Sequence, residues 1–264
     1  MLLLLSIACV LANADGSPPL LAPRASHLDE VGAEPSPAPW PTNTDGLNIL
    51  PSPIAIPDRT FRLFLDAGHG EPNNSGNQSA ACEAEQDVML LIADDIARRL
   101  AASPHLQIQR SRSGDARPSY SERIKQAENW PADLILSLHS DARGGVELGY
   151  SAEGCYQIGD SAGFSVLWGE DEPAGTTGLA AKRRAYGALL SDTLIHAGFT
   201  AYDGNDYVGL YRADTSFSGL FLDSHIPKKR IRMLRRPIVP SLILETHNAP
   251  RIYYEGHRSF RDWL

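Results

Sequence analysis

The sequence predicts an α/β fold, a single domain in which a mainly parallel twisted sheet is flanked by helices on both faces. Short apolar runs without strict alternation are typical of strands that are covered on both sides. Amphipathic helical patterns lie between these runs, and such alternation favours a parallel sheet. The chain has 264 residues, 42% of them hydrophobic, which is enough to bury one substantial core.

The N-terminal residues are typical of an export signal. Residues 2–12 form an apolar segment too short to span a bilayer, and Ala12 and Ala14 supply the small residues that signal peptidase requires. We expect a signal peptide at residues 1–14 and an exported protein in the periplasm or cell envelope. A competing interpretation, which we favour less, has Cys9 lipidated as an anchor.

Residues 15–58 are rich in proline and predict a disordered linker, because such segments prefer extended polyproline conformations to a packed core. At about 3.1 Å per residue this linker could reach on the order of 100 Å. The catalytic domain would then occupy residues 59–264. The formal net charge of −8 argues against a nucleic-acid partner, since such proteins attract phosphates with a basic surface.

Strands are expected, in chain order, at residues 61–65, 106–109, 134–138 and 242–244. The first helix should carry an apolar stripe over residues 88–100. On its opposite face Asp94 and Arg98, and Asp95 and Arg99, are spaced as i,i+4 ion pairs.

Two further helices have recognisable ends. Ser119 and Glu122 fit a capping box that opens a helix running to about Asn129. Another apolar stripe, over residues 186–194, should end near Gly198, a residue suited to a left-handed C-terminal cap.

Two segments admit more than one interpretation. Residues 144–178 form an unusually long connection, either a loop that faces substrate or a solvated insertion without a role. The basic run at residues 228–236 could attract anionic polymers. We slightly favour a solvated helix face with Ile231 and Leu234 directed inwards.

After signal cleavage only Cys82 and Cys155 would remain. An exported protein meets an oxidising compartment, so these cysteines could form a disulfide. Two unpaired thiols that merely pack remain the alternative.

Polar side chains follow three of the expected strands, at the edge where ligands bind in open α/β sheets. They are Asp66 and His69, then His139, and finally Glu245 and His247. Two imidazoles and one carboxylate with a fourth position open are typical of a catalytic zinc site. Glu85 is the natural third ligand, and Glu83 is its rival.

Several motifs resemble, in order, those of zinc-dependent N-acetylmuramoyl-L-alanine amidases of the amidase 3 family. The matching segments are LDAGHG at 65–70, EQDV at 85–88, SERI at 121–124 with AEN at 127–129, DLILSLHSDA at 133–142 and PSLILE at 240–245. The resemblance runs from about Phe61 to the C-terminus.

The resemblance implies that His69, Glu85 and His139 hold Zn²⁺ and that Glu245 is the catalytic acid/base. The implied function is an exported hydrolase that cleaves the amide bond between N-acetylmuramic acid and the L-alanine of the peptidoglycan stem peptide. The alternatives are another zinc amidase or peptidase on the same fold, and a cell-wall-binding module without catalytic activity. No activating protein partner is evident from the sequence.

One departure from the family pattern follows Glu245, where Thr246-His247-Asn248 replaces the usual Gly-Phe or similar pair. We interpret His247 as an ordinary loop histidine rather than as a substrate or metal ligand. Arg112 and Arg123 match arginine positions common in the family and are expected to form structural ion pairs. Asp66 is expected to orient a ligand histidine.

Overall fold

The computed structural model describes residues 60–252. The predicted signal peptide, the linker, Cys9 and the last twelve residues of the predicted catalytic domain lie outside this part of the chain. Within it, no helix combines the length and the apolar character needed to cross a membrane.

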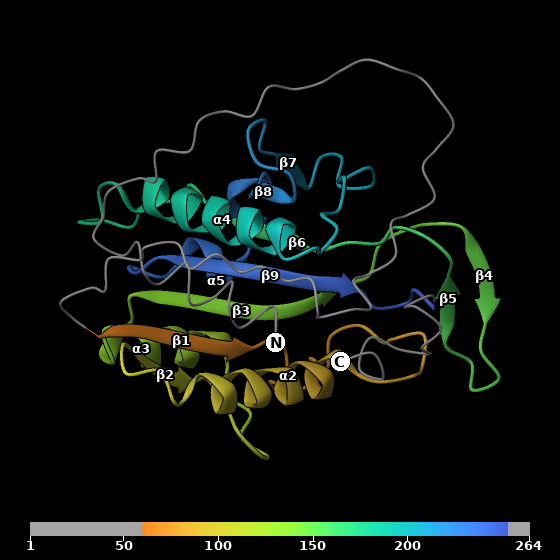
Figure 1. The fold of residues 1–264 in the computed structure, drawn as a ribbon, viewed down its shortest axis with the longest axis horizontal. Helices are drawn as coiled ribbons and strands as arrows, with labels where there is room; N and C mark the ends of the chain where they lie inside the picture. Colours follow the sequence, from red (N-terminus) through yellow and green to blue (C-terminus); the bar gives the residue numbers. More distant parts are fainter. Residues whose placement is uncertain (1–59, 253–264) are drawn as a thin grey trace.

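A seven-stranded sheet forms the centre of the fold (Figure 1). Its strands, in spatial order, are β2 (Leu106–Arg110), β1 (Phe61–Ala67), β3 (Leu134–Asp141), β9 (Ser241–Asn248), β6 (Ser165–Trp168), β8 (Leu220–Asp223) and β7 (Tyr211–Ala213). The four strands β2, β1, β3 and β9 are parallel, and β6 then runs antiparallel to β9. The predicted α/β fold with a mainly parallel sheet is confirmed.

Helices cover both faces of this sheet, as predicted. Helices α2 (Glu85–Leu100) and α4 (Leu179–His196) share one buried cluster with Leu63 and Leu65 of β1. Helices α3 (Tyr120–Asn129) and α5 (Arg232–Arg235) pack with Phe64 on the other side. Successive strand residues point to opposite faces, so one apolar run supplies two cores.

The capping box at Ser119 and Glu122 is present, and it fixes the start of α3 at the following residue. Beyond α4, Gly198 adopts the expected left-handed conformation with φ +93°. The predicted pair of Asp94 and Arg98 is wrong, although Asp95 does pair with Arg99.

The reason for the error lies in the tertiary structure. The Asp94 carboxylate instead accepts a hydrogen bond from Arg110 at the end of β2, and Arg98 pairs with Asp95. The neighbouring strand thus offers Asp94 a partner that helical spacing alone does not reveal.

The segment 144–178 contains more structure than predicted. It holds a two-stranded sheet, β4 (Glu147–Tyr150) with β5 (Tyr156–Ile158), and then β6 of the main sheet. Figure 1 shows β4 and β5 beyond the edge to which the arrowheads of β1, β3 and β9 point. Of the two interpretations for the cysteines, the structure contains the disulfide between Cys82 and Cys155.

The basic run is not one continuous helix. It forms a short 3-10 helix, η2 (Pro227–Lys229), and then α5. Leu234 is buried and Ile231 is partly buried, as expected, but Arg230 pairs with Glu170 and Asp171. Part of the positive charge is therefore neutralised within the domain.

Candidate metal centre

Three predicted ligand residues meet at the carboxyl edge of the sheet. His69 follows β1, His139 lies in the adjacent parallel strand β3, and Glu85 is the first residue of α2. One ligand atom from each lies within 4.8 Å of the others, so this group could hold a metal ion.

The Glu85 carboxylate lies between the two imidazoles. Oε2 of Glu85 is 3.1 Å from Nε2 of His69, and Oε1 is 3.0 Å from Nδ1 of His139. The rings of the two histidines are nearly perpendicular, with centroids 4.8 Å apart. Glu85, and not its rival Glu83, is the carboxylate in this group.

Glu85 is held as an anion. Burial raises the pKa of its carboxyl group, but hydrogen bonds from His139 and His69 outweigh burial and hold the pKa far below its ordinary value. The backbone N–H groups of Asn77 and Ser140 each donate to the carboxylate at 3.0 Å. This buried negative charge is suited to a cation.

His69 is oriented by the polar loop that follows it. Its Nδ1 lies 2.7 Å from Oδ1 of Asn74, an amide oxygen that only accepts, so Nδ1 carries a proton and Nε2 faces Glu85. Burial lowers the pKa of His69, but the hydrogen bond and charge of Glu85 outweigh it, and the pKa lies above the ordinary 6.5. A cation at this point would replace the Nε2 proton.

Two glycines make room for the ligands. A Cβ atom at Gly68 would lie 2.5 Å from Cε1 of His139, and one at Gly76 would collide with the Glu85 carboxylate. Gly76 also has φ +78°, a conformation that favours glycine. These positions therefore require residues without side chains.

Asp66 is linked to the proposed ligand His69 through Arg123. Its fully buried carboxylate accepts hydrogen bonds from Arg123, at 3.0 Å, and from the Ser137 hydroxyl. Arg123 in turn donates to the carbonyl oxygen of His69. Asp66 thus supports His69 through Arg123, because the strand directs its carboxylate into the core.

Of the two arginines expected in structural ion pairs, Arg123 forms one with Asp66. Arg112 is also buried, but its side chain donates hydrogen bonds to the backbone carbonyl oxygens of Ala67, Gly68 and Gln86. Both side chains hold the segment between β1 and α2, which carries the first ligand.

Glu245 lies beside the three ligand residues on β9. It is in register with His139 of β3 and with Ser165 of β6. Its Oε2 atom is buried and has no hydrogen-bond partner among the residues that the structure describes. Burial raises the pKa of Glu245 well above its ordinary value, and the charges of Asp141 and Glu85 raise it further.

A buried network lies next to Glu245. The Arg143 guanidinium donates to Asp141, at 2.9 Å, and to the hydroxyl of Ser165, also at 2.9 Å. Tyr207 donates to Asp141 as well. The charge of Arg143 partly offsets the rise in the pKa of Glu245. This network thus sets the electrostatic surroundings of Glu245.

The sequence alone does not predict a role at this site for Arg143, Tyr207, Asn74 or Asn77. The two asparagines lie in the polar stretch directly after His69, and this stretch was the available signal. No comparable signal exists for Tyr207, which lies 66 residues from Asp141.

His247 is not a loop residue, since it lies within β9 and is 4% exposed. Its Nδ1 is 2.8 Å from the hydroxyl of Thr246. Burial, with a smaller contribution from the charge of Arg143, lowers the pKa of His247 to about 3. Its imidazole is therefore neutral at physiological pH.

Comparison with known proteins identifies similar sequences and folds. Residues 63–248 match the model of the Amidase_3 family, described as N-acetylmuramoyl-L-alanine amidase. The chain is 38% identical over 80 residues to the N-acetylmuramoyl-L-alanine amidase LytC of Bacillus subtilis (strain 168). That alignment covers 30% of this chain and only 16% of LytC.

Two solved structures have similar folds. Ami1, an N-acetylmuramyl-L-alanine amidase from Mycobacterium abscessus, is 17% identical with a TM-score of 0.49, over 73% of this chain and 86% of Ami1. The catalytic domain of the N-acetylmuramoyl-L-alanine amidase CwlV, from Bacillus (Paenibacillus) polymyxa var. colistinus, is 20% identical with a TM-score of 0.44, over 71% and 80% of the two chains.

Removing Arg123 should destabilise the domain strongly. Arg123→Met leaves the buried Asp66 carboxylate without its cation, and we expect the free energy of unfolding to fall by about 3–5 kcal/mol. Urea denaturation measures this change. The double variant Asp66→Leu/Arg123→Met should lose less stability than Arg123→Met, because it leaves no unpaired charge buried. An unchanged urea midpoint for Arg123→Met would contradict the role given to the pair.

Proposed function

Because the chain belongs to the Amidase_3 family, described as N-acetylmuramoyl-L-alanine amidase, we propose that it is an exported zinc-dependent cell-wall hydrolase. It would cleave the amide bond between N-acetylmuramic acid and the L-alanine of the peptidoglycan stem peptide. The observation that carries this proposal is the meeting of His69, Glu85 and His139 beside Glu245.

The donor set fits zinc. Two imidazole nitrogens and one carboxylate, with a fourth position for water or substrate, are the ligands of many catalytic zinc sites. Cysteine, the usual ligand of structural zinc, is absent from the group. Asn74 holds the outer nitrogen of His69, which is the kind of support that fixes a ligand imidazole.

Zinc, when bound, supplies Lewis acidity that polarises an amide carbonyl and makes water a better nucleophile at neutral pH. Glu245 would perform the proton transfers. The positive charge of a metal ion on the three ligands would favour the ionised form of Glu245, so that Glu245 could accept the proton of the attacking water. Its desolvated position then favours return of that proton to the leaving amine.

The network around Arg143 lies next to this base and acts on it through the charge of Arg143. Ser165, whose hydroxyl accepts a hydrogen bond from Arg143, lies directly opposite Glu245 on the neighbouring strand. Glu245 sits on a strand that is paired on both sides, and such strands position catalytic groups more rigidly than loops do.

The bond that is cleaved can be identified by digestion of purified peptidoglycan. The protein should release stem peptides with a free L-alanine amino terminus, lose this activity on chelation and regain it with zinc. Glu245→Gln should lower kcat/KM by about 10²- to 10⁴-fold while the zinc content is unchanged. Glu83→Ala is the matched control, because it removes a nearby carboxylate outside the ligand group and should retain activity.

Two results of that digestion would favour the alternatives. Cleavage of a different amide bond would support another amidase or peptidase on this fold. Binding to peptidoglycan without new amino termini would support a wall-binding module. If Glu245→Gln kept full activity, Glu245 would not be the catalytic acid/base.

Zinc affinity should fall as the pH falls. The pKa of His69 lies above 6.5 in the cation-free protein, so protons compete for Nε2 already at mildly acidic pH. Competition with a chelating dye between about pH 5 and pH 8 measures the effect. His105→Gln, which alters an exposed histidine, should leave the profile unchanged. An affinity that stays constant down to the acidic limit would contradict His69 as a ligand.

Export is proposed from the apolar segment and its small-residue cleavage pattern within residues 1–14. Mass spectrometry of the protein from its native envelope should find a mature chain that starts at Asp15. A chain that starts with acylated Cys9 would instead support the lipid anchor, and an intact Met1 in the cytoplasm would contradict both.

A further inference from the structure

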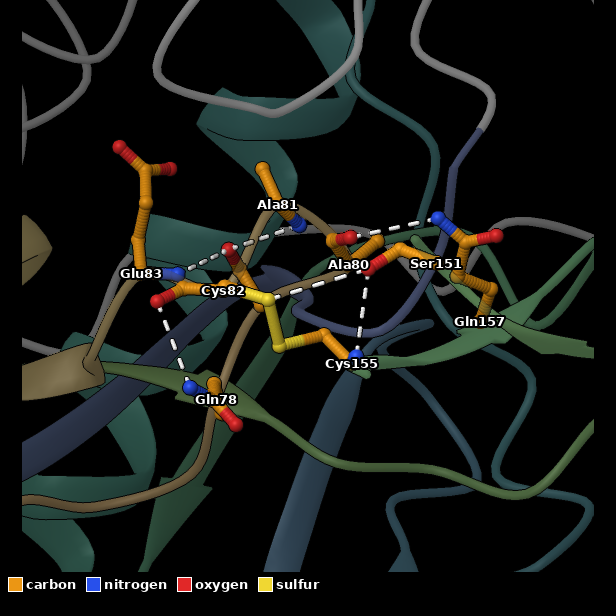
Figure 2. Close-up of a disulfide and its surroundings, with 9 residues drawn as sticks. Gln78, Ala80, Ala81, Cys82, Glu83, Ser151, Cys155 and Gln157 are labelled. Carbon is orange, nitrogen blue, oxygen red and sulfur yellow. Dashed lines mark hydrogen bonds between the residues drawn. A yellow bond between two sulfur atoms is a disulfide. The ribbon is translucent and has the colours of Figure 1, made fainter. Parts of the chain in front are cut away.

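The disulfide between Cys82 and Cys155 joins two segments that are 73 residues apart in the sequence (Figure 2). Cys82 lies three residues before Glu85, and Cys155 directly precedes β5. The bond therefore ties the approach to a proposed metal ligand to the β4–β5 hairpin.

Residues 77–85, here called the Cys82 turn, form a narrow hairpin of their own. Gln78 and Ala84 form an isolated antiparallel bridge, and the Ser79 N–H donates to the Glu83 carbonyl at 2.9 Å. At the tip, Cys82 has φ +64°, the left-handed region. The two arms of the turn are therefore held together between its tip and its base.

The base of the Cys82 turn holds the Glu85 carboxylate. The N–H of Asn77 donates to Oε2 of Glu85, and the N–H of Glu85 donates to the carbonyl of Asn77, both at 3.0 Å. The Asn77 side chain also donates to the carbonyl of Ser140, next to the ligand His139. A shift of this base would move a donor away from the carboxylate that lies between the histidines.

The tip of the turn is fixed to the domain by the disulfide, by a hydrogen bond from the Ser151 hydroxyl to the Cys82 sulfur, and by two hydrogen bonds at Ala80. The N–H of Ala80 donates to the carbonyl of Ala249 at 2.9 Å. The Gln157 side chain donates to the carbonyl of Ala80 at 3.3 Å, as Figure 2 shows. The hairpin that supplies Cys155 is anchored as well, since the N–H of Ile158 donates to the carbonyl of Pro250. The covalent bond is the strongest of these attachments.

We propose that the Cys82–Cys155 disulfide positions Glu85, so that oxidation of the two thiols completes the high-affinity metal site. This inference rests on the metal site of the proposed function. In the reaction the thiols lose two protons and two electrons as the S–S bond forms. A disulfide oxidant accepts both and becomes a dithiol, as in ordinary thiol–disulfide exchange.

The expected effect is on metal affinity. Loss of groups that hold metal ligands typically weakens binding by about 10- to 100-fold. The ligands themselves remain when the disulfide is absent, and two hydrogen bonds still hold the tip. We therefore expect zinc binding weaker by roughly 10-fold, at the lower end of that range.

The test compares zinc dissociation constants, measured with a chelating dye well below the melting temperature of each variant. Cys82→Asn/Cys155→Ser removes the bond without leaving a thiol that could bind zinc, and asparagine tolerates the left-handed backbone. Leu194→Ala is the matched control, since it opens a cavity in the core at α4 and lowers stability without touching the Cys82 turn.

The double cysteine variant should bind zinc about 10-fold more weakly than the native protein, whereas Leu194→Ala should keep the native affinity. A double variant that melts earlier but binds zinc as tightly would overturn the inference and leave the disulfide a purely stabilising bond. Glu85→Ala separates the two proposals. If the Glu85→Ala variant binds zinc as tightly as the native protein does, the proposed metal site is contradicted.

Discussion

The parallel pairing of β1 with β3 is the constraint on which the rest of the site depends. Ala67 is in register with Leu138, so the chain leaves β1 beside the position where His139 stands on β3. A slip of one residue would turn His139 to the opposite face, because side chains alternate along a strand. The apolar neighbours in both strands are fully buried, and their burial enforces this register.

Near the paired strands β1 and β3, two carboxyl groups have pKa values that are shifted in opposite directions. Glu85 receives hydrogen bonds from both histidines and from two backbone amides, and it is ionised. Glu245 has one buried oxygen without a partner among the described residues, and its carboxyl group retains a proton more readily. Environments that separate two pKa values in this way suit one group to bind a cation and the other to carry a proton.

The sequence predicted the parts whose signals are local. The apolar runs of β1, β3 and β9 end in polar residues, and the capping box at Ser119 locates α3. Strands β6, β7 and β8 are only three or four residues long, too short for a periodic pattern to stand out. The partners of Asp66 and Asp94 come from distant segments, so spacing along the chain could not identify them. His247 was misjudged because nothing local indicates that β9 continues past Glu245.

The reversal of direction between β9 and β6 affects how far the connection from β3 to β6 can vary in length. Strand β3 ends, and β6 begins, on the same rim of the sheet, so the intervening segment with its small hairpin departs from and returns to one neighbourhood. Insertions or deletions in this segment change the free energy of folding by little more than the loop-closure entropy, which grows slowly with loop length. The segment beside the carboxyl edge of the sheet can thus change in length while the paired strands that carry His139 and Glu245 stay unaltered.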